Sequence, residues 1–249
     1  MPGRSSSSQR RKERQKTMPL SQNWYKKKQN YISKNQRRVL RELWPQYGVD
    51  LHFGQRLLMN EFFEKYDSKS KCVLDIGFGL GDSLIAMSKD RPDDHFIGIE
   101  IHRAGIASAL ERAEEKTLKN IKTIRADITM LLEGNYLLEH SIDEVCVFFP
   151  DPWPEFRDVN RRVIRNQIID LLEPIMKEGG LLRIATDAGD YAEHIKRVMS
   201  RAEKWHLDCF EVHKAGEGSP WARERSLTKY EIKAGVEGRL IHEFIYQKI

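Results

Sequence analysis

The chain has 249 residues, of which 40% are hydrophobic and 32% are charged, and its formal net charge is +5. This length suits one large domain with tails, which can bury a core without disulfides. No apolar run approaches the roughly 20 residues of a membrane span, and the N-terminus lacks the apolar segment of a secretory signal. The three cysteines and eight histidines are scattered, without the spacing of metal ligands. We therefore expect a cytoplasmic protein with reduced thiols, no bound metal and no membrane contact.

Positive charge is concentrated at the N-terminus. Residues 1–38 carry twelve Lys and Arg and one acid, a net +11, so the rest of the chain carries a net −6. Residues 1–20 are rich in Ser, Arg, Lys and Gln and predict a disordered basic tail. In residues 21–50 basic side chains are interleaved with aromatic ones, which predicts an arm and a helix that bind RNA phosphates and stack on bases. A solvated tail with no ligand is the alternative for residues 1–18.

Two helices are predicted before the first strand. Residues 34–44 have apolar side chains at helical spacing, and we expect this helix to end at Pro45 and Gly48. Residues 55–66 predict a second helix, whose leucines and phenylalanines pack inward.

From residue 72 onward, short apolar runs alternate with helical patterns. Alternation of this kind predicts a parallel sheet with helices on both faces. The expected strands lie at 72–76, 95–99, 121–125, 142–149 and 181–185, and the expected helices lie at 104–117, 161–176 and 191–202, with one more beginning at 82. Residues 207–213 and 240–248 predict two further strands with no obvious helix between them. We expect these two to pair antiparallel at one edge of the sheet.

The turn after the first of these strands contains three alternating glycines, Gly77, Gly79 and Gly81. Without Cβ atoms, backbone can pass close to a ligand there. A dinucleotide fingerprint would require glycine at position 82, but Asp82 stands there, and a carboxylate at a helix N-terminus repels pyrophosphate. With Asp75 just before the turn, the pattern favours a ligand with a cationic head and no phosphate, of which S-adenosylmethionine is the common one. A glycine turn that merely packs is the alternative.

Five carboxylates lie in or at the ends of predicted strands: Asp75, Glu100, Asp127, Asp151 and Asp187. In an open α/β sheet the ligand crevice lies outside the carboxyl ends of the strands. Each acid alone could be a helix cap or a turn residue. Five together indicate a binding site, because Asp and Glu are rarely buried without partners.

The roles of these acids follow from what each can accept. Glu100 lies 19 residues after Gly81, where a carboxylate accepts from both ribose hydroxyls of a bound nucleoside. Asp127 can accept from the adenine amino group, and Asp75 lies near the methionine ammonium. Asp151 stands between two prolines that restrict its backbone, which makes it a candidate for the substrate side.

Four segments together resemble the tRNA (guanine-N7-)-methyltransferase family: Ile76-Gly77-Phe78-Gly79, Phe149-Pro150-Asp151-Pro152-Trp153-Pro154, Thr186-Asp187 and Thr228-Lys229-Tyr230-Glu231. The resemblance extends from about Trp24 to the C-terminus. It implies an α/β, Rossmann-like class I methyltransferase fold over residues 51–249, with a mostly parallel twisted sheet, helices on both faces and an antiparallel edge strand. It also implies that S-adenosylmethionine methylates N7 of a guanine in the variable loop of tRNA.

The resemblance assigns site residues as well. The methyl donor is expected at Asp75, Glu100, Asp127 and Asp151, together with the turn glycines Gly77, Gly79 and Gly81. Asp151 is also the expected catalytic residue. Substrate contacts are expected at Glu155, Asp187, Thr228, Lys229, Tyr230 and Glu231. Thr228 and Glu231 also have the spacing of a capping box at a helix start.

One departure from the family concerns the residues after Pro154. The family usually has two lysines there, one of them a substrate contact, whereas this chain has Glu155 and Phe156. The basic run that follows is thinned to Arg157, Arg161, Arg162 and Arg165. We therefore expect the RNA to be held differently at this segment.

The expected methyl transfer to guanine N7 requires positioning and charge stabilisation from the protein. Guanine N7 has a lone pair and no proton, so no general base is needed, and we expect Asp151 to orient the base and stabilise the cationic product ring. Asp187 or Glu231 would accept from the Watson–Crick edge of the guanine. The alternatives are methylation of another base or a small molecule, and an RNA-binding protein without activity. The sequence leaves a monomer and a homodimer equally open.

Overall fold

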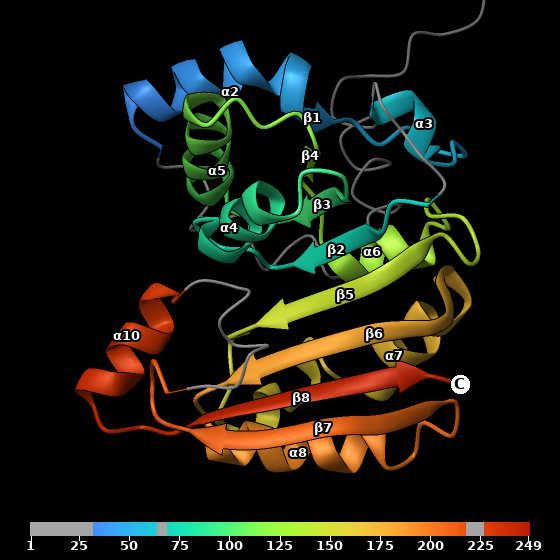
Figure 1. Ribbon diagram of the computed structural model, residues 1–249, viewed down its shortest axis with the longest axis vertical. Helices are drawn as coiled ribbons and strands as arrows, with labels where there is room; N and C mark the ends of the chain where they lie inside the picture. The colour runs from blue at the N-terminus through green and yellow to red at the C-terminus, as the bar shows by residue number, and fades with distance from the viewer. Residues whose placement is uncertain (1–31, 64–68, 218–226) are drawn as a thin grey trace, which may run out of the picture.

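The computed structural model describes residues 32–63, 69–217 and 227–249. The predicted tail at 1–20, and residues 21–31 of the predicted arm, lie outside these ranges. Eight strands are formed in the described chain: β1 Gly48–Val49, β2 Cys72–Ile76, β3 His95–Ile99, β4 Ile121–Ile124, β5 Ile142–Phe148, β6 Met176–Thr186, β7 Trp205–His213 and β8 Ile241–Lys248. They make one sheet in the order β1-β4-β3-β2-β5-β6-β8-β7 (Figure 1).

The sheet is parallel from β1 to β6 and becomes antiparallel at its far side. β8 runs antiparallel to both of its neighbours, β6 and β7. The expected antiparallel pairing of the last two strands is therefore confirmed, although β8 lies one position in from the edge and β7 forms the edge itself. All residues of β2 and β3 are buried, as expected for parallel strands covered on both faces.

Helices connect and cover these strands: α2 Lys34–Tyr47, α3 Met59–Phe62, α4 Asp82–Asp90, α5 Arg103–Glu115, α6 Ile128–Glu133, α7 Asn166–Leu172, α8 Gly189–Met199 and α10 Lys229–Val236. Two short 3-10 turns, η2 Phe156–Arg161 and η3 Glu173–Ile175, flank α7. Side chains of α2, α4 and α5 share one core cluster with Val73 of β2. Those of α6, α7 and α8 share another with Leu74. Because neighbouring residues of a strand point to opposite faces, the prediction of helices on both faces is confirmed.

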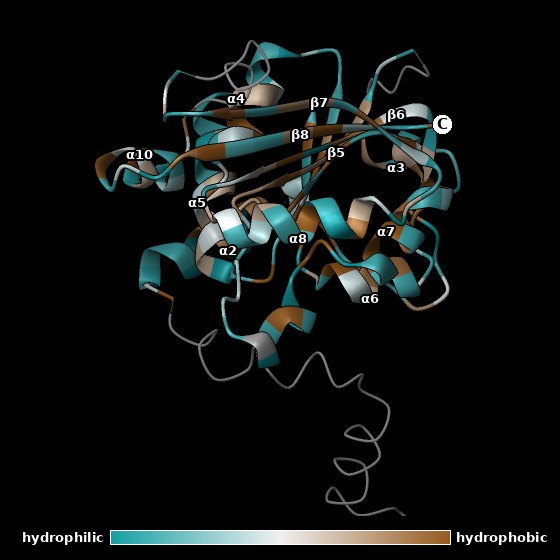
Figure 2. Cartoon of the chain, turned by 90° about the horizontal axis from the view of Figure 1, so that it is seen from below, coloured by the Kyte–Doolittle hydropathy of each residue, from teal (hydrophilic) through white to brown (hydrophobic). Residues whose placement is uncertain are grey.

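The helices that cover the sheet are amphipathic. In Figure 2, α7 and α8 each carry a hydrophobic and a hydrophilic side. In α8, Tyr191, Ala192 and Ile195 are buried, whereas Glu193 between them is exposed. Helix α2 packs against α5, where Tyr47 Oη donates to Glu114 at 2.8 Å.

Several predicted helix boundaries are wrong. Helix α2 continues through Pro45, which was expected to help end it, but its C-cap is Gly48 as expected, and the Gly48 N–H donates to Trp44 C=O. Of the helix expected at 55–66, residues 64–66 lie outside the described ranges, and within 55–63 only α3 is helical. Leu58, expected to pack inward, is exposed. Instead of one helix over 161–176, the chain is extended at Arg162 and at Arg165, with α7 starting after them. These two arginines bind elsewhere in the fold, as described below.

Strand β1 and helix α6 were not predicted. Helix α10 begins at the capping pattern expected at Thr228, although no obvious helix was expected between the last two strands. None of the helices in the described ranges is long and apolar enough to cross a membrane. The three cysteines are free thiols; Cys72 and Cys146 are buried, whereas Cys209 is only partly so.

Candidate active site

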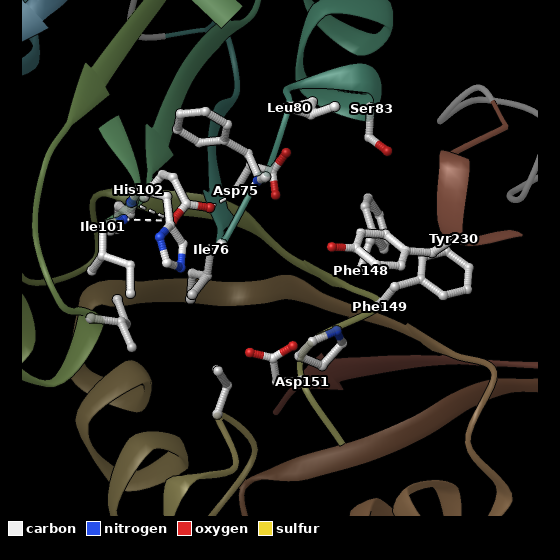
Figure 3. A pocket seen from close by; sticks show the side chains of 18 of the residues that line it. Asp75, Ile76, Leu80, Ser83, Ile101, His102, Phe148, Phe149, Asp151 and Tyr230 are labelled. Carbon is white, nitrogen blue, oxygen red and sulfur yellow. Dashed lines mark hydrogen bonds between the residues drawn. The ribbon is translucent and has the colours of Figure 1, made fainter. Parts of the chain in front are cut away.

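A pocket opens at the carboxyl ends of the central strands, between the turn after β2 and the start of α10 (Figure 3). Most of the site residues predicted from the sequence line it: Asp75, Gly77, Gly79, Glu100, Asp127, Asp151, Thr228, Lys229 and Tyr230. The other predicted residues, Gly81, Glu155, Asp187 and Glu231, do not line this pocket. The hollow is shared by residues that lie more than 150 positions apart in the sequence, from Asp75 to Tyr230.

The glycine turn forms the floor of the pocket. Gly77 and Gly79 have φ values of +72° and +59°, which glycine adopts without a Cβ penalty. A Cβ added at Gly77 would meet nothing within 4 Å, so that side of the turn is open. At Gly81 (φ +85°) an added Cβ would lie 2.8 Å from Ala109 Cβ. Gly81 therefore serves the packing of α4 on α5, whereas Gly77 faces the open pocket.

Glu100 ties the glycine turn to the end of β3. One carboxylate oxygen accepts from Gly79 N–H at 2.9 Å, and the other accepts from the N–H groups of Ile101 and His102 at 2.7 and 2.8 Å. The residue is buried, with an exposed fraction of 6%. These bonds fix the orientation of the carboxylate before any ligand binds.

Asp75 lies deepest in the pocket. It is 2% exposed, and its Oδ2 makes no hydrogen bond within the described part of the chain. Burial, followed by repulsion from Glu100 and Glu144, raises the pKa of Asp75 to about 8. A buried carboxylate with an unused oxygen is costly unless a hydrogen-bond donor or a cation reaches it. This end of the pocket therefore fits a ligand with a positively charged donor group.

Two further acids have structural partners. Asp127 caps helix α6, accepting from Thr129 N–H at 2.8 Å, so the helix-cap alternative for this residue is correct as well. The carboxylate of Asp82 accepts from Arg112 at 2.6 Å, and Arg112 also donates to Gly81 C=O. The predicted repulsion of phosphate by Asp82 is therefore weaker than the sequence suggested, because a guanidinium partly neutralises that carboxylate.

The loop after β5 carries Asp151, whose carboxylate points into the pocket (Figure 3). The backbone is strained on both sides of it: Phe149 has a φ of +50° and Trp153 a φ of +41°. Non-glycine residues in this region cost free energy and persist only where the surroundings hold them.

Arg162 holds the loop around Asp151 in this conformation. Its guanidinium donates to Pro152 C=O at 2.7 Å and to Trp153 C=O at 3.2 Å, and it pairs with Asp190 at 2.8 Å. The residue is only 3% exposed and lies over the Tyr191 ring. Of the four arginines in the thinned basic run after Phe156, this one is buried and binds the loop. No signal in the sequence identified that role.

The start of α10 forms the other wall of the pocket. Thr228 caps the helix by accepting from Glu231 N–H at 3.2 Å, as the capping pattern predicted. The Tyr230 ring is stacked on Phe149, with ring centroids 6.4 Å apart. Tyr230 is exposed, whereas Glu231 is buried at 1% exposure behind this wall.

Asp187 and Glu155 lie away from the pocket lining. Asp187, at the end of β6, pairs with Arg239. Glu155 is exposed and pairs with Arg157 at 2.5 Å. His102 was not predicted, yet it lines the pocket with its side chain beside Ile101 (Figure 3). Its position two residues after Glu100 is the only sequence signal that could have found it.

The architecture is shared with solved methyltransferases. A structure described as an antibiotic-related methyltransferase has a TM-score of 0.57 at 14% identity and covers 81% of this chain and 96% of its own. The antibiotic-resistance methyltransferase Kmr has a TM-score of 0.50 at 14% identity, covering 72% and 87%. The [4+2]-cyclase SpnF also has a TM-score of 0.50 at 14% identity, covering 72% and 75%. The fold therefore does not fix the chemistry by itself.

Sequence comparison narrows the class. Residues 69–244 match a family model described as a putative methyltransferase. A tRNA (guanine-N(7)-)-methyltransferase of Nitrosococcus oceani is 36% identical over 86% of this chain and 85% of its own length. Proteins of the same name from Nitrosomonas eutropha and Halorhodospira halophila are 33% and 32% identical, over 90% and 93% of this chain and 95% and 96% of their own. The protein is a methyltransferase. Within that class, it belongs to the tRNA (guanine-N(7)-)-methyltransferase family.

Proposed function

We propose that this enzyme transfers the methyl group of S-adenosyl-L-methionine to N7 of a guanine in the variable loop of tRNA, in the cytoplasm. The observation that carries the proposal is the convergence of Asp75, Glu100, Asp127 and Asp151 on one pocket, from the ends of four different strands. Family membership identifies the reaction class, and the pocket chemistry agrees with it.

The residues present fit this methyl donor. The ammonium of its methionine part would donate to the Asp75 oxygen that has no hydrogen bond. The open side of Gly77 leaves room for the rest of the methionine part of the donor. Glu100 already accepts from three backbone N–H groups, so about one of its four lone-pair sites, on the oxygen bound by Gly79 N–H, is left to accept from a ribose hydroxyl. Asp127 would accept from the adenine amino group with the oxygen that does not cap α6.

The bound donor supplies an electrophilic methyl group on a sulfonium. The protein then has to place guanine N7 in line with that methyl, and good alignment contributes on the order of 7–11 kcal/mol. It also has to tolerate positive charge on the guanine ring as it forms. Asp151 is the residue for this, because its carboxylate faces the pocket from a loop clamped by Arg162. A negative charge fixed there stabilises the cationic ring in the transition state.

The guanine would enter beside α10. The exposed ring of Tyr230 offers a surface on which a purine can stack, next to Thr228 and Lys229. Asp187 and Glu231 remain the candidates for accepting from the Watson–Crick edge. Asp187 is the more accessible of the two, because its side chain is 15% exposed whereas Glu231 is 1% exposed.

The test is incubation with labelled methyl donor and tRNA that lacks 7-methylguanosine, followed by nuclease digestion and base analysis. Label in 7-methylguanosine is expected, and Asp151→Asn is expected to lower kcat about 100- to 1000-fold, with a smaller loss of donor affinity because Asp151 is also an expected donor contact. Glu231→Gln tests base choice, since it should relax selection of guanine or abolish activity while donor binding persists. Label in another base would overturn the assignment of N7. Donor binding without any transfer would support an RNA-binding protein that has lost activity.

A further inference from the structure

Arg239 lies just after α10 and connects this helix to the end of β6. The chain leaves α10 through Gly238, whose φ is +68°, and the Arg239 N–H donates to Ala234 C=O at 2.8 Å. This is the Schellman arrangement, in which a residue in the left-handed conformation ends a helix. The place of Arg239 is thus fixed by the way α10 ends, and its side chain pairs with Asp187, the residue that follows β6.

Helix α10 has little apolar packing to hold it on the sheet. Ala234 is the only apolar residue among its eight that is buried, and it packs in a small cluster with Phe149, Ala185 and Ile241. Because hydrophobic stabilisation grows with the apolar area that is buried, a single alanine anchors a helix weakly. The ion pair with Asp187 therefore supplies a second tie between α10 and the sheet.

The guanidinium of Arg239 lies between two carboxylates. Its Nη1 donates to Asp187 Oδ2, its Nε donates to Glu237 Oε2 at 2.9 Å, and its Nη2 lies 2.8 Å from that same oxygen of Glu237. A guanidinium is planar and permanently charged, so contacts with two acids fix both its position and its plane. Asp187 is the more enclosed of the two acids, because its side chain is 15% exposed against 47% for Glu237. Arg239 thus restrains a partly buried carboxylate at the carboxyl end of the sheet.

The carboxylate of Asp187 keeps capacity for further donors. Within the part of the chain that the structure describes, its Oδ1 accepts no hydrogen bond and its Oδ2 accepts only from Arg239. A carboxylate has about four lone-pair sites, so about three remain. The Watson–Crick edge of guanine presents two neighbouring donors, N1–H and N2–H₂, which one carboxylate can accept through its two oxygens. Asp187 can therefore accept from both donors without releasing Arg239.

The end of β6 and helix α10 both border the substrate side of the pocket. In Figure 1 the arrowheads of β5 and β6 both point toward α10. Phe149, which lines the pocket, donates its N–H to Ala185 C=O at 2.7 Å, two residues before Asp187. Residues 228–230 of α10 and its cap line the same pocket. The side chain of Arg239 therefore joins two elements that lie on either side of the place where a base would enter.

We propose that Arg239 is a positioning residue that sets the selection of guanine. By pairing with Asp187 it holds that carboxylate where it accepts from the Watson–Crick edge, and it holds α10 where Tyr230 lines the pocket. The inference rests on the proposed function, because it takes guanine as the methylated base. It selects Asp187 over Glu231 as the acceptor, and it adds a residue that no pattern in the sequence indicated. Arg239 acts through Asp187 and does not itself touch the base.

The test uses tRNA in which inosine replaces the guanosine that is methylated. Inosine keeps N7 and N1–H but lacks the 2-amino group, so it removes one of the two donors offered to Asp187. The ratio of kcat/KM for the guanosine tRNA to kcat/KM for the inosine tRNA measures that contact. We expect a ratio of about 10–100 in the wild type, because a hydrogen bond to a charged group is lost with inosine. In Arg239→Met the ratio is expected to fall below about 3, and Arg239→Lys, which keeps the charge, should recover part of it.

Lys177→Met is the matched control, because it breaks an ion pair at the opposite end of the same strand. The Lys177 side chain is 36% exposed, as is that of Arg239, and it pairs with Asp143 at 2.8 Å near the start of β6. This variant is expected to keep the wild-type ratio. Donor affinity, measured by calorimetry, is expected to be unchanged in Arg239→Met. Adding Arg239→Met to Asp187→Asn should not change the ratio of Asp187→Asn further, because Arg239 acts through Asp187.

The outcomes are distinct from one another. A wild-type ratio near 1 would overturn the inference, and so would an Arg239→Met variant that loses rate equally on both tRNAs, since its ratio would then be that of the wild type and its role only structural. If Arg239→Met fails to fold, as judged by its thermal transition, Arg239→Lys decides, and the wild-type ratio in that variant would overturn the inference. A wild-type enzyme that places no label in 7-methylguanosine of unmodified tRNA would instead defeat the proposed function.

Discussion

The two sides of the active site are held in shape by different means. On the donor side, Gly77 and Gly79 take positive φ at no steric cost, and the turn is tied to Glu100 by backbone hydrogen bonds. On the substrate side, Phe149 and Trp153 take positive φ without being glycine, at a cost of order 1–3 kcal/mol each.

The substrate side compensates through tertiary contacts. Arg162 binds the carbonyls of Pro152 and Trp153, and Arg161 lies over the Trp153 ring at 4.8 Å. The donor side therefore depends on which residues stand in its own turn, whereas the substrate side depends on side chains that the fold brings to it. A substitution on the donor side should act locally, and one that removes the clamp should weaken both stability and catalysis.

Replacing Arg162 by Met is expected to have the largest effect. It leaves two backbone carbonyls without their donor in a buried site, and we expect a loss of about 2–5 kcal/mol in the free energy of unfolding. The loop would also relax toward negative φ and displace Asp151. Urea unfolding measures the first effect, and kcat against the donor Kd measures the second, with kcat expected to fall further.

Asp190→Asn is the control for this variant. It removes the charge partner of Arg162 but leaves both bonds to the loop carbonyls. The Asp190 side chain is 56% exposed, so the expected cost is below about 1 kcal/mol. The clamp would be refuted by equal losses in Arg162→Met and Asp190→Asn, or by a Met variant with the kcat of the wild type.

The glycine turn offers a second comparison, between Gly81→Ala and Gly77→Ala. Each places a side chain at positive φ, which costs roughly 1–2 kcal/mol. At Gly81 the new methyl would also collide with Ala109, for which we expect a further cost of roughly 1–3 kcal/mol. Gly77→Ala meets no atoms, so it should be the more stable variant and yet the poorer binder of donor. The free energy of unfolding and the donor affinity, measured by calorimetry, test this for both variants. If the variant with the higher free energy of unfolding also bound the donor more tightly, the prediction would be contradicted.

Much of the fold was predictable because it depends on local patterns. The residues assigned to β2 and β3 match the predicted strands from end to end, since continuous apolar runs bounded by polar residues are typical of parallel strands. The predicted helix over 161–176 was wrong because contacts distant in the sequence decide the structure there. Its apolar spacing is helical, but Arg162 and Arg165 lie extended so that they can bind Trp153 C=O and Thr129 Oγ1, and α7 starts only after them. Tertiary contacts overrode local preference there.

The same division applies to the site. Asp75, Glu100, Asp127 and Asp151 were predicted from their places at strand ends, which sheet topology brings together. Two ion pairs could not be predicted. Arg162 pairs with Asp190, 28 positions away, and Arg239 pairs with Asp187, 52 positions away, and no sequence spacing indicates such pairs. Whether Asp187 touches the substrate could not be read from the sequence, because it depends on that second pair.

Asp75 gives a pH-dependent prediction on the donor side. With a pKa of about 8 it is mostly protonated at pH 7, and an ammonium bound beside it would favour the carboxylate. Donor binding at pH 7 is therefore expected to release close to one proton, measured by calorimetry in buffers of different ionisation enthalpy. Asp75→Asn should release none. Equal release by the wild type and the variant would assign the proton to another group.

The same shift affects stability. The unfolded carboxyl has a pKa near 3.9, so between about pH 4 and pH 8 the folded state holds a proton that the unfolded state has lost. The free energy of unfolding should accordingly fall as the pH rises through that window, by up to about 1.4 kcal/mol per pH unit. Asp75→Asn should remove this contribution. A difference between the two proteins that does not change from pH 5 to pH 8 would argue against a raised pKa.

The smallest expected effect concerns Glu155, where the resemblance to the family led us to expect lysine. Its side chain is 58% exposed, so Glu155→Lys should change the free energy of unfolding by less than about 0.5 kcal/mol. The change breaks the pair with Arg157, removes one negative charge and adds one positive charge beside the loop of Asp151. We expect tRNA affinity to rise a few-fold and the salt slope to increase by about 1. Glu193→Lys on α8 is the matched control, because its side chain is 67% exposed and also pairs with a cation, Lys196. If tRNA affinity rises equally in both variants, the rise reports net charge only. If it rises only in Glu155→Lys, the substrate side contacts the RNA through an exposed edge that acts independently of the Arg162 clamp.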